Sequence, residues 1–252
     1  MACRYSPVGP IQILERLQGA EALGNYLLVI AHDVLVDDMG YSLLLDSLPY
    51  REDAPTFVIV DNGVIEHGIA LSVRDVIDAA DRAQADCIVM PDVIGDLKRT
   101  MALVFDGLPR LQDSGYPVMK VPQGKDISEV VRCIDWLADV AFPSSEDFWG
   151  IPRWMANKFG TRAPIIEYIN TCRPNPKIHL LGMSHSWTDD VHCARMRNVI
   201  GIDSANPVVR GLLGQQMKID SPEHLERGDY WASTEINGIV LDNIQYVREA
   251  IT

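Results

Sequence analysis

The sequence lacks the patterns that send a chain through or into a membrane. Its first residues do not combine positive charge with an apolar run, as a secretory signal does. No stretch approaches the roughly 18 consecutive apolar residues that a membrane-spanning helix needs. We therefore expect a cytoplasmic protein that has no membrane partner.

Paired cysteines and a dinucleotide-binding motif are missing as well. The chain of 252 residues has five cysteines, and no two of them form a CxxC pair. An odd, unpaired set favours free thiols in a reducing compartment over a disulfide framework. The GxGxxG loop that would follow the first strand of a dinucleotide-binding domain is also absent, so we expect no such cofactor.

Positive charge is scarce overall but concentrated in one segment. The net charge of −13 disfavours nucleic acid as a partner of the surface as a whole. Residues 153–210, however, contain eight lysines and arginines against four acidic residues. This segment is either ordinary solvated surface or a local anion-binding face. For the second hypothesis the candidate nucleic-acid-binding residues are Arg153, Lys158 and Arg162, whose spacing places them partly on one helix face.

The sequence does contain a repeated pattern of strand and helix. Short apolar runs recur at intervals of about 30 residues, which is the length of a βα unit. The predicted strands are Tyr26–Ala31, Phe57–Val60, Cys87–Met90, Pro117–Val121, Phe148–Ile151, Ile178–Leu181 and Val199–Ile202.

Helical periodicity fills the intervals between these runs. Ser72–Arg82 and Asp126–Ala138 each open with a residue that can cap a helix, and Asp96 is expected to cap another. A further helical segment, Arg153–Asn170, contains Pro164, which must kink or divide it.

These elements predict a single α/β domain over residues 1–252. Strands that are almost entirely apolar indicate a parallel sheet covered on both faces. We expect a (β/α)8 TIM-type barrel, and an open doubly wound sheet is the alternative. The eighth strand is predicted near Tyr230–Ser233, with a closing helix from about Asn243; a loop over Gly228–Asn237 is the other possibility.

Polar residues follow several of the predicted strands. Asp61, Asp92, Gln123 and Asp203 each stand just past an apolar run, where barrel enzymes carry their catalytic groups. One such aspartate is often only a turn former or a helix cap. Three carboxylates and an amide around one opening suit a planar polar ligand instead. An ionised carboxylate there could also act as a nucleophile, typically on a glycosidic carbon.

The motifs around these residues resemble, in the same order, those of the tRNA-guanine transglycosylase superfamily. The similarity is greatest to its compact phage and bacterial members, which place 7-deazaguanines into DNA. The matching motifs are VDNGVIEHG (Val60–Gly68), IVMPDVIGD (Ile88–Asp96), VPQGK (Val121–Lys125), WGIPR (Trp149–Arg153), IHLLGMS (Ile178–Ser184) and GIDSANP (Gly201–Pro207).

This resemblance implies a role for each candidate residue. Asp203 corresponds to the nucleophile that attacks the sugar C1′, and Asp61 to the aspartate that assists proton transfer at the base pocket. The implied reaction exchanges a guanine in the nucleic acid for a 7-deazaguanine of the preQ0 or preQ1 type, without a cofactor. The candidate substrate-binding residues are Asn62, Asp92, Gln123, Gly150 and Gly182.

The sequence departs from the tRNA-modifying enzymes at their zinc site. Those enzymes carry three closely spaced cysteines and a histidine, and no CxCxxC occurs here. Nor do His179, His185, His192 and Cys193 have a recognised zinc spacing. We therefore expect no metal, and DNA plus a free 7-deazaguanine as substrates. The alternatives are exchange in tRNA, a carboxylate-dependent nucleoside or glycoside hydrolase, and a non-catalytic binding barrel.

Overall fold

The protein folds into one barrel of parallel strands, which a computed structural model describes for residues 2–48, 55–140, 142, 146–184, 186–218, 231 and 235–252. The strands form a single sheet in the order β1-β8-β7-β6-β5-β4-β3-β2. They are β1 (Arg4–Pro7), β2 (Tyr26–Ile30), β3 (Phe57–Asp61), β4 (Cys87–Val89), β5 (Val118–Lys120), β6 (Phe148–Pro152), β7 (Lys177–Leu181) and β8 (Val199–Ser204).

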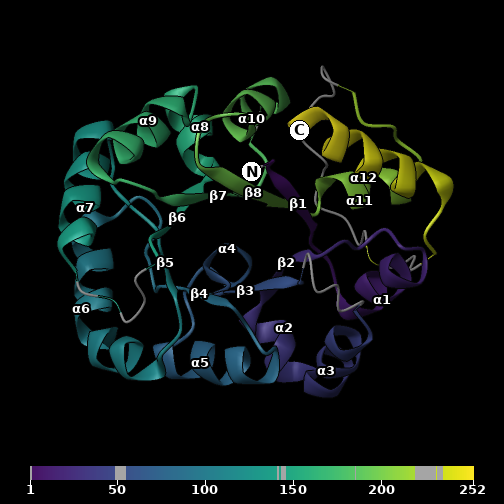
Figure 1. Cartoon of the computed structure of the whole chain (residues 1–252), viewed down its shortest axis with the longest axis horizontal. Helices are drawn as coiled ribbons and strands as arrows, with labels where there is room; N and C mark the ends of the chain where they lie inside the picture. The colour runs from purple at the N-terminus through teal and green to yellow at the C-terminus, as the bar shows by residue number, and fades with distance from the viewer. Residues whose placement is uncertain are drawn as a thin grey trace.

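Most helices surround these strands on the outside, whereas the short helix Val64–His67 lies over the opening of the barrel (Figure 1). In the described residues they are α1 (Ile11–Gly19), α2 (Ala31–Val36), α3 (Asp38–Ser47), α4 (Val64–His67), α5 (Val73–Arg82), α6 (Leu97–Ser114), α7 (Ile127–Asp139), α8 (Arg153–Phe159), α9 (Ala163–Cys172), α10 (Trp187–Ala194), α11 (Asn206–Leu212) and α12 (Gly238–Ile251). No helix in this part of the chain has both the length and the apolar character needed to span a bilayer.

Strand β1 brings the two ends of the sheet together. It pairs with β8 in parallel, with Ser6 opposite Asp203. On its other side the hydroxyl of Ser6 accepts a hydrogen bond from the backbone N–H of Leu28 in β2, at 2.7 Å. Sequential strand order with first and last strands adjacent confirms the (β/α)8 barrel. It excludes the open doubly wound sheet, whose strand order reverses at a switch point.

Seven strands lie where the apolar runs predict them, but the prediction for the eighth is wrong. The eighth strand is β1, at the start of the chain. Sequence reasoning missed it because Arg4–Pro7 is short and contains one large apolar side chain, Tyr5. The predicted location, Tyr230–Ser233, lies outside the described residues except for Trp231. The closing helix is confirmed as α12, which begins at Gly238.

Helix ends follow the capping residues that the sequence indicates. Ser72 accepts a hydrogen bond from Asp75 N at the start of α5, and Asp96 caps α6 in the same way. Asp126 caps α7 through Glu129 N, at 2.9 Å. The long helical segment is divided into α8 and α9, as expected, but the break lies at Gly160, whose left-handed backbone ends α8. Pro164 lies in the first turn of α9, where the missing N–H leaves no bond unmade.

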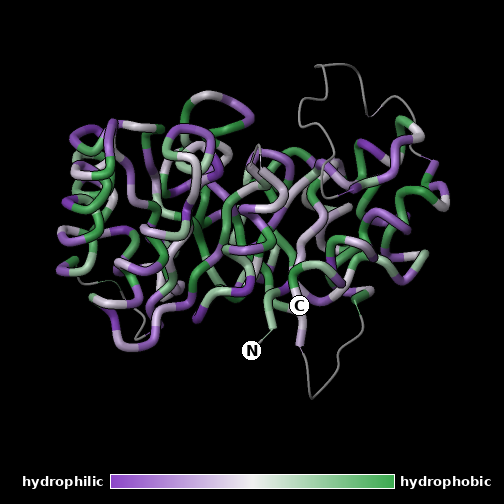
Figure 2. Tube along the Cα trace, turned by 90° about the horizontal axis from the view of Figure 1, so that it is seen from above, coloured by the Kyte–Doolittle hydropathy of each residue, from purple (hydrophilic) through white to green (hydrophobic). Residues whose placement is uncertain are grey.

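The core lies inside the barrel and between the barrel and its helices. Strand residues such as Ile59 and Ile88 are completely buried, and each such side chain stabilises the fold by about 1.5–3 kcal/mol. The outer helices alternate between hydrophobic and hydrophilic residues along the chain (Figure 2), as expected for helices with one buried face. Aromatic rings fill the N-terminal end of the barrel, where Tyr26, Phe57 and Phe148 contact one another in turn.

Candidate active site

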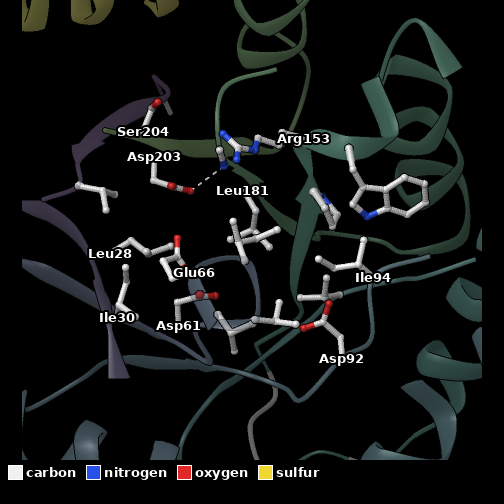
Figure 3. Close-up of a pocket in the computed structure, with 18 of the residues that line it drawn as sticks. Leu28, Ile30, Asp61, Glu66, Asp92, Ile94, Arg153, Leu181, Asp203 and Ser204 are labelled. Atoms are coloured by element: carbon white, nitrogen blue, oxygen red, sulfur yellow. Dashed lines mark hydrogen bonds between the residues drawn. The ribbon is translucent and has the colours of Figure 1, made fainter. Parts of the chain in front are cut away.

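A pocket of about 240 Å³ opens at the C-terminal ends of the strands (Figure 3). Leu28, Ile30, Val89 and Leu181 are among its apolar walls. Its polar and aromatic lining consists of Asp61, Glu66, Asp92, Gln123, Arg153, Trp154, Gly182, Asp203 and Ser204. The barrel thus gathers the two candidate catalytic residues with Asp92, Gln123, Gly182 and Arg153, although they come from six different strand ends.

The two carboxylate oxygens of Asp203 have different surroundings. Oδ1 accepts a hydrogen bond from the backbone N–H of Gly182, at 3.0 Å, and contacts Nε2 of His179 at 2.9 Å. Among the described residues Oδ2 has no hydrogen-bond partner. Only 9% of the residue is exposed, and it lines the pocket. One oxygen is therefore fixed to the protein, while the other is free to react with a ligand.

His179 in turn is held by Tyr26 inside the barrel. The Tyr26 hydroxyl lies 2.7 Å from Nδ1 of His179, and both side chains are almost completely buried. Burial raises the pKa of Tyr26 well above its usual value, so the phenol keeps its proton and donates a hydrogen bond to Nδ1. The tautomer assigned from this network carries its hydrogen on Nε2 and donates to Asp203.

Two glycines make this arrangement possible. A Cβ on Gly201 in β8 would lie 2.2 Å from the ring of Tyr26, so only glycine leaves room for that ring. Gly182 has φ +74°, in the left-handed region that favours glycine, and a Cβ there would meet Arg153 Cδ at 3.0 Å. The peptide that donates to Asp203 thus depends on the absence of a side chain.

Arg162 lies behind this peptide rather than on a nucleic-acid-facing surface. Its side chain is completely buried and pairs with Asp190 at 2.6 Å. It also donates to the backbone oxygens of Ile151 and Gly182. The expectation that Arg162 contacts phosphate is therefore wrong, because a guanidinium enclosed by protein cannot reach a ligand. Its position instead supports the turn that carries Gly182.

A second network of hydrogen bonds lies on the other side of the pocket. Asp92 accepts from the side-chain amide of Asn62 at 2.7 Å and from that of Gln123 at 2.6 Å. The Gln123 carbonyl accepts from Gly95 N and from the indole of Trp154. These bonds fix the amide of Gln123, so its acceptor side is occupied and its NH₂ group points toward Asp92.

Burial shifts the acid–base behaviour of the pocket carboxyls. Desolvation raises the pKa of Asp92 to about 6, against the opposing effect of its two amide donors. It raises the pKa of Asp61 well above its usual value, and the neighbouring charge of Glu66 raises it further. Partial burial, with a contribution from Asp203, also raises the pKa of Glu66 at the solvent-exposed rim. Asp61 therefore favours the protonated form and can serve as a proton donor.

Besides Arg162, three predicted site residues do not line the pocket. Gly150 lies within β6, where a Cβ would come within 2.6 Å of Leu181, so it determines the shape of the pocket wall indirectly. Asn62 is buried and acts through Asp92. Lys158 is exposed on α8, with its ammonium 5.9 Å from the ring centre of Trp154.

Sequence reasoning missed Glu66, Trp154 and the role of His179. The first two belong to quoted motifs or lie beside them, but nothing in their spacing shows that they face the pocket. His179 looked like an ordinary core residue because it alternates with apolar neighbours in β7. Within the described residues, from which His185 is missing, no three His, Cys, Asp or Glu side chains are arranged to hold a metal ion.

Comparison of the chain with models of known protein families gives no match, and a search of curated proteins gives no relative.

Proposed function

We propose that this protein is a guanine transglycosylase that exchanges a guanine in DNA for a 7-deazaguanine base. The observation that carries the proposal is the environment of Asp203. One of its oxygens is held by Gly182 and His179, and the other has no partner among the described residues. The same pocket contains Asp61, a carboxyl whose pKa is raised well above its usual value by burial. A fixed carboxylate and a nearby proton donor are what glycosidic bond exchange requires.

Each step of the exchange has a group to perform it. Oδ2 of Asp203 attacks C1′ of the sugar as the bond from C1′ to guanine N9 breaks, and the electron pair of that bond passes to N9. Asp61 donates its proton to the leaving guanine. The entering base then returns a ring N–H proton to Asp61, while its nitrogen attacks C1′ and displaces Asp203. Both carboxyls regain their starting forms, and no net oxidation occurs.

The network around Asp92 supports recognition of a purine edge. Asp92 offers oxygens that can accept paired N–H donors from a heterocycle, and the amide of Gln123 is fixed beside it. Losing a partner for such a buried group costs about 1–3 kcal/mol, which gives the pocket its selectivity.

The size of the pocket bears on how a nucleic acid would be presented. A cavity of about 240 Å³ suits one flat ring system rather than a stacked duplex. The reacting nucleotide must therefore leave the helix or come from a single strand. Arg153 and Lys158 are exposed beside this opening and are the proposed phosphate contacts. DNA is the preferred acceptor because the sequence lacks the cysteine cluster of the tRNA-modifying enzymes.

Isotopically labelled guanine offered together with a DNA oligonucleotide tests the proposal. Label that enters the DNA supports exchange, provided that Asp203→Asn abolishes it. Loss of guanine without incorporation would instead identify a hydrolase on the same carboxylates. Labelling of tRNA but not DNA would identify tRNA as the acceptor, and no reaction with either nucleic acid would contradict the proposal.

A further inference from the structure

A second cavity lies at the N-terminal end of the barrel, opposite the candidate active site. Its volume is about 290 Å³, and its lining includes Arg4, Phe57, Phe148, Lys177 and Asn198. These residues stand at or just before the first positions of β1, β3, β6, β7 and β8. None of the residues that line this cavity lines the pocket around Asp203.

Arg4 is the most unusual residue of this cavity. Its guanidinium lies 4.2 Å from the ring centre of Tyr26 and 5.6 Å from that of Phe57. Its Nε is buried without a hydrogen-bond partner, and the described residues provide no carboxylate within ion-pair distance. Asp86 acts on Arg4 electrostatically but forms no ion pair with it; one of its oxygens accepts a hydrogen bond from Val58 N.

Burying a guanidinium without a counter-ion costs free energy, and for this reason buried charges in proteins are normally paired. Burial also lowers the pKa of Arg4, which reflects the cost of its charge. The face of an aromatic ring compensates only in part, by about 0.5–2 kcal/mol. Because Nε is buried, the terminal nitrogens of the planar guanidinium are the donors that can match a carboxylate or phosphate in this cavity.

Lys177 supplies a second positive charge to the same cavity. Its ammonium lies 4.9 Å from the ring centre of Phe148 and forms an ion pair with Glu146. Both side chains of this pair are at least 40% exposed, so the pair is weak and can exchange for a stronger partner. Two cations beside an aromatic layer favour a dianion over a monoanion.

We propose that this cavity binds the phosphate group of a small molecule, with Arg4 and Lys177 as its cationic ligands. The phosphate takes the place of the missing counter-ion of Arg4 and accepts from its fork in a bidentate manner. The aromatic rings beside it accommodate the apolar part of the ligand. The site is independent of the proposed base exchange, because it lies at the other end of the barrel and uses different residues.

Calorimetric titration with inorganic phosphate at neutral pH and constant ionic strength tests this site. We expect saturable binding by the wild type, weakened at least about tenfold in Arg4→Gln through the lost charge-assisted bonds. Arg110→Gln, the matched change at an exposed arginine on α6, should bind phosphate as the wild type does. The reverse pattern, or no saturable binding by the wild type, would overturn the proposal.

A second measurement guards against a folding defect in Arg4→Gln. Ligand binding to the native state raises Tm, so phosphate should raise the Tm of the wild type more than that of Lys177→Gln. Lys177 is half-exposed, and its replacement leaves the core intact. An equal phosphate-dependent rise in Tm in wild type and Lys177→Gln would count against the site.

Discussion

At Asp203 one carboxylate oxygen is held by hydrogen bonds, and the other is free. Asparagine would keep the size of the side chain but remove the charge that offsets an oxocarbenium-like carbon. We expect Asp203→Asn to lower the exchange rate by at least about 10³-fold while base binding and the fold remain. The wild type, but not this variant, should form a covalent adduct with DNA on denaturing gels.

Asp96→Asn provides the control for this change. Asp96 caps α6 outside the pocket, and asparagine caps helices equally well, so activity should be unchanged. Near-normal turnover by Asp203→Asn would remove Asp203 from the mechanism.

Tyr26 acts on the reaction only through His179, which makes it a positioning residue. Tyr26→Phe removes the hydroxyl that fixes the tautomer of His179 and leaves Nδ1 without a donor. Loss of that bond corresponds to about 1–2 kcal/mol, so we expect kcat to fall roughly tenfold, with little change in KM.

Tyr116→Phe serves as the comparison, because it removes a hydroxyl–carboxylate bond to Asp81 far from the pocket. If both variants kept the wild-type kcat and KM, the contact between Tyr26 and His179 would be purely structural.

At the scale of elements, three cations that look equivalent in the sequence have different surroundings on α8 and at the start of α9. Arg153 and Lys158 are exposed on α8, whereas Arg162, which caps α9, is enclosed and paired with Asp190. Helix α8 ends at Gly160, whose backbone is left-handed, so Arg162 is not on the exposed face of α8 with the other two cations. Only the first two remain candidates for binding DNA phosphates.

Charge removal on α8 should alter the salt dependence of DNA binding. Each lost phosphate contact reduces the log–log slope by about 0.9, so Arg153→Gln combined with Lys158→Gln should flatten it by up to about 1.8. Binding curves at several salt concentrations measure this slope. Arg16→Gln with Arg110→Gln removes two exposed charges from other helices and should leave it unchanged. An unaltered slope in the α8 variant would place DNA on another surface.

For the molecule as a whole, the buried carboxyls link stability to pH. The pKa of Asp92 is about 6 in the folded protein, against a usual value of 3.8, so the folded state binds the proton more tightly. The resulting stabilisation is complete below about pH 4 and is lost as the pH rises through about 6. For Asp92 this amounts to roughly 2–3 kcal/mol of unfolding free energy.

Urea unfolding of the wild type and Asp92→Asn at intervals between acid and neutral pH isolates this contribution. Relative to the variant, the wild type should lose stability by that amount as pH rises. Asp113 is an exposed carboxyl on α6, so the unfolding free energy of Asp113→Asn should depend on pH as that of the wild type does. If the unfolding free energies of the wild type and Asp92→Asn changed with pH in the same way, burial would not raise the pKa of Asp92.

The sequence alone determined the barrel and most of the residues around its opening. A buried parallel strand consists mostly of apolar residues, so apolar runs at regular spacing predict the strands of the barrel. The residue after each run lies at the same end of the barrel. Asp61, Asp92, Gln123 and Asp203 could therefore be assigned to one opening before any coordinates were known. Capping by Ser72, Asp96 and Asp126 was predictable for a similar reason, because it depends on neighbours in the chain.

What only the tertiary structure decided depends on contacts between distant segments. Strand β1 has too few apolar residues to be recognised locally, and it is defined by pairing with β8 at the other end of the chain. The contacts from Tyr26 through His179 to Asp203 join three strands, and they exist because Gly201 leaves space for a ring from across the barrel. Arg162 and Arg4 look like ordinary cations in the sequence. In the folded barrel Arg162 has a carboxylate partner, whereas Arg4 has none among the residues that the structure describes.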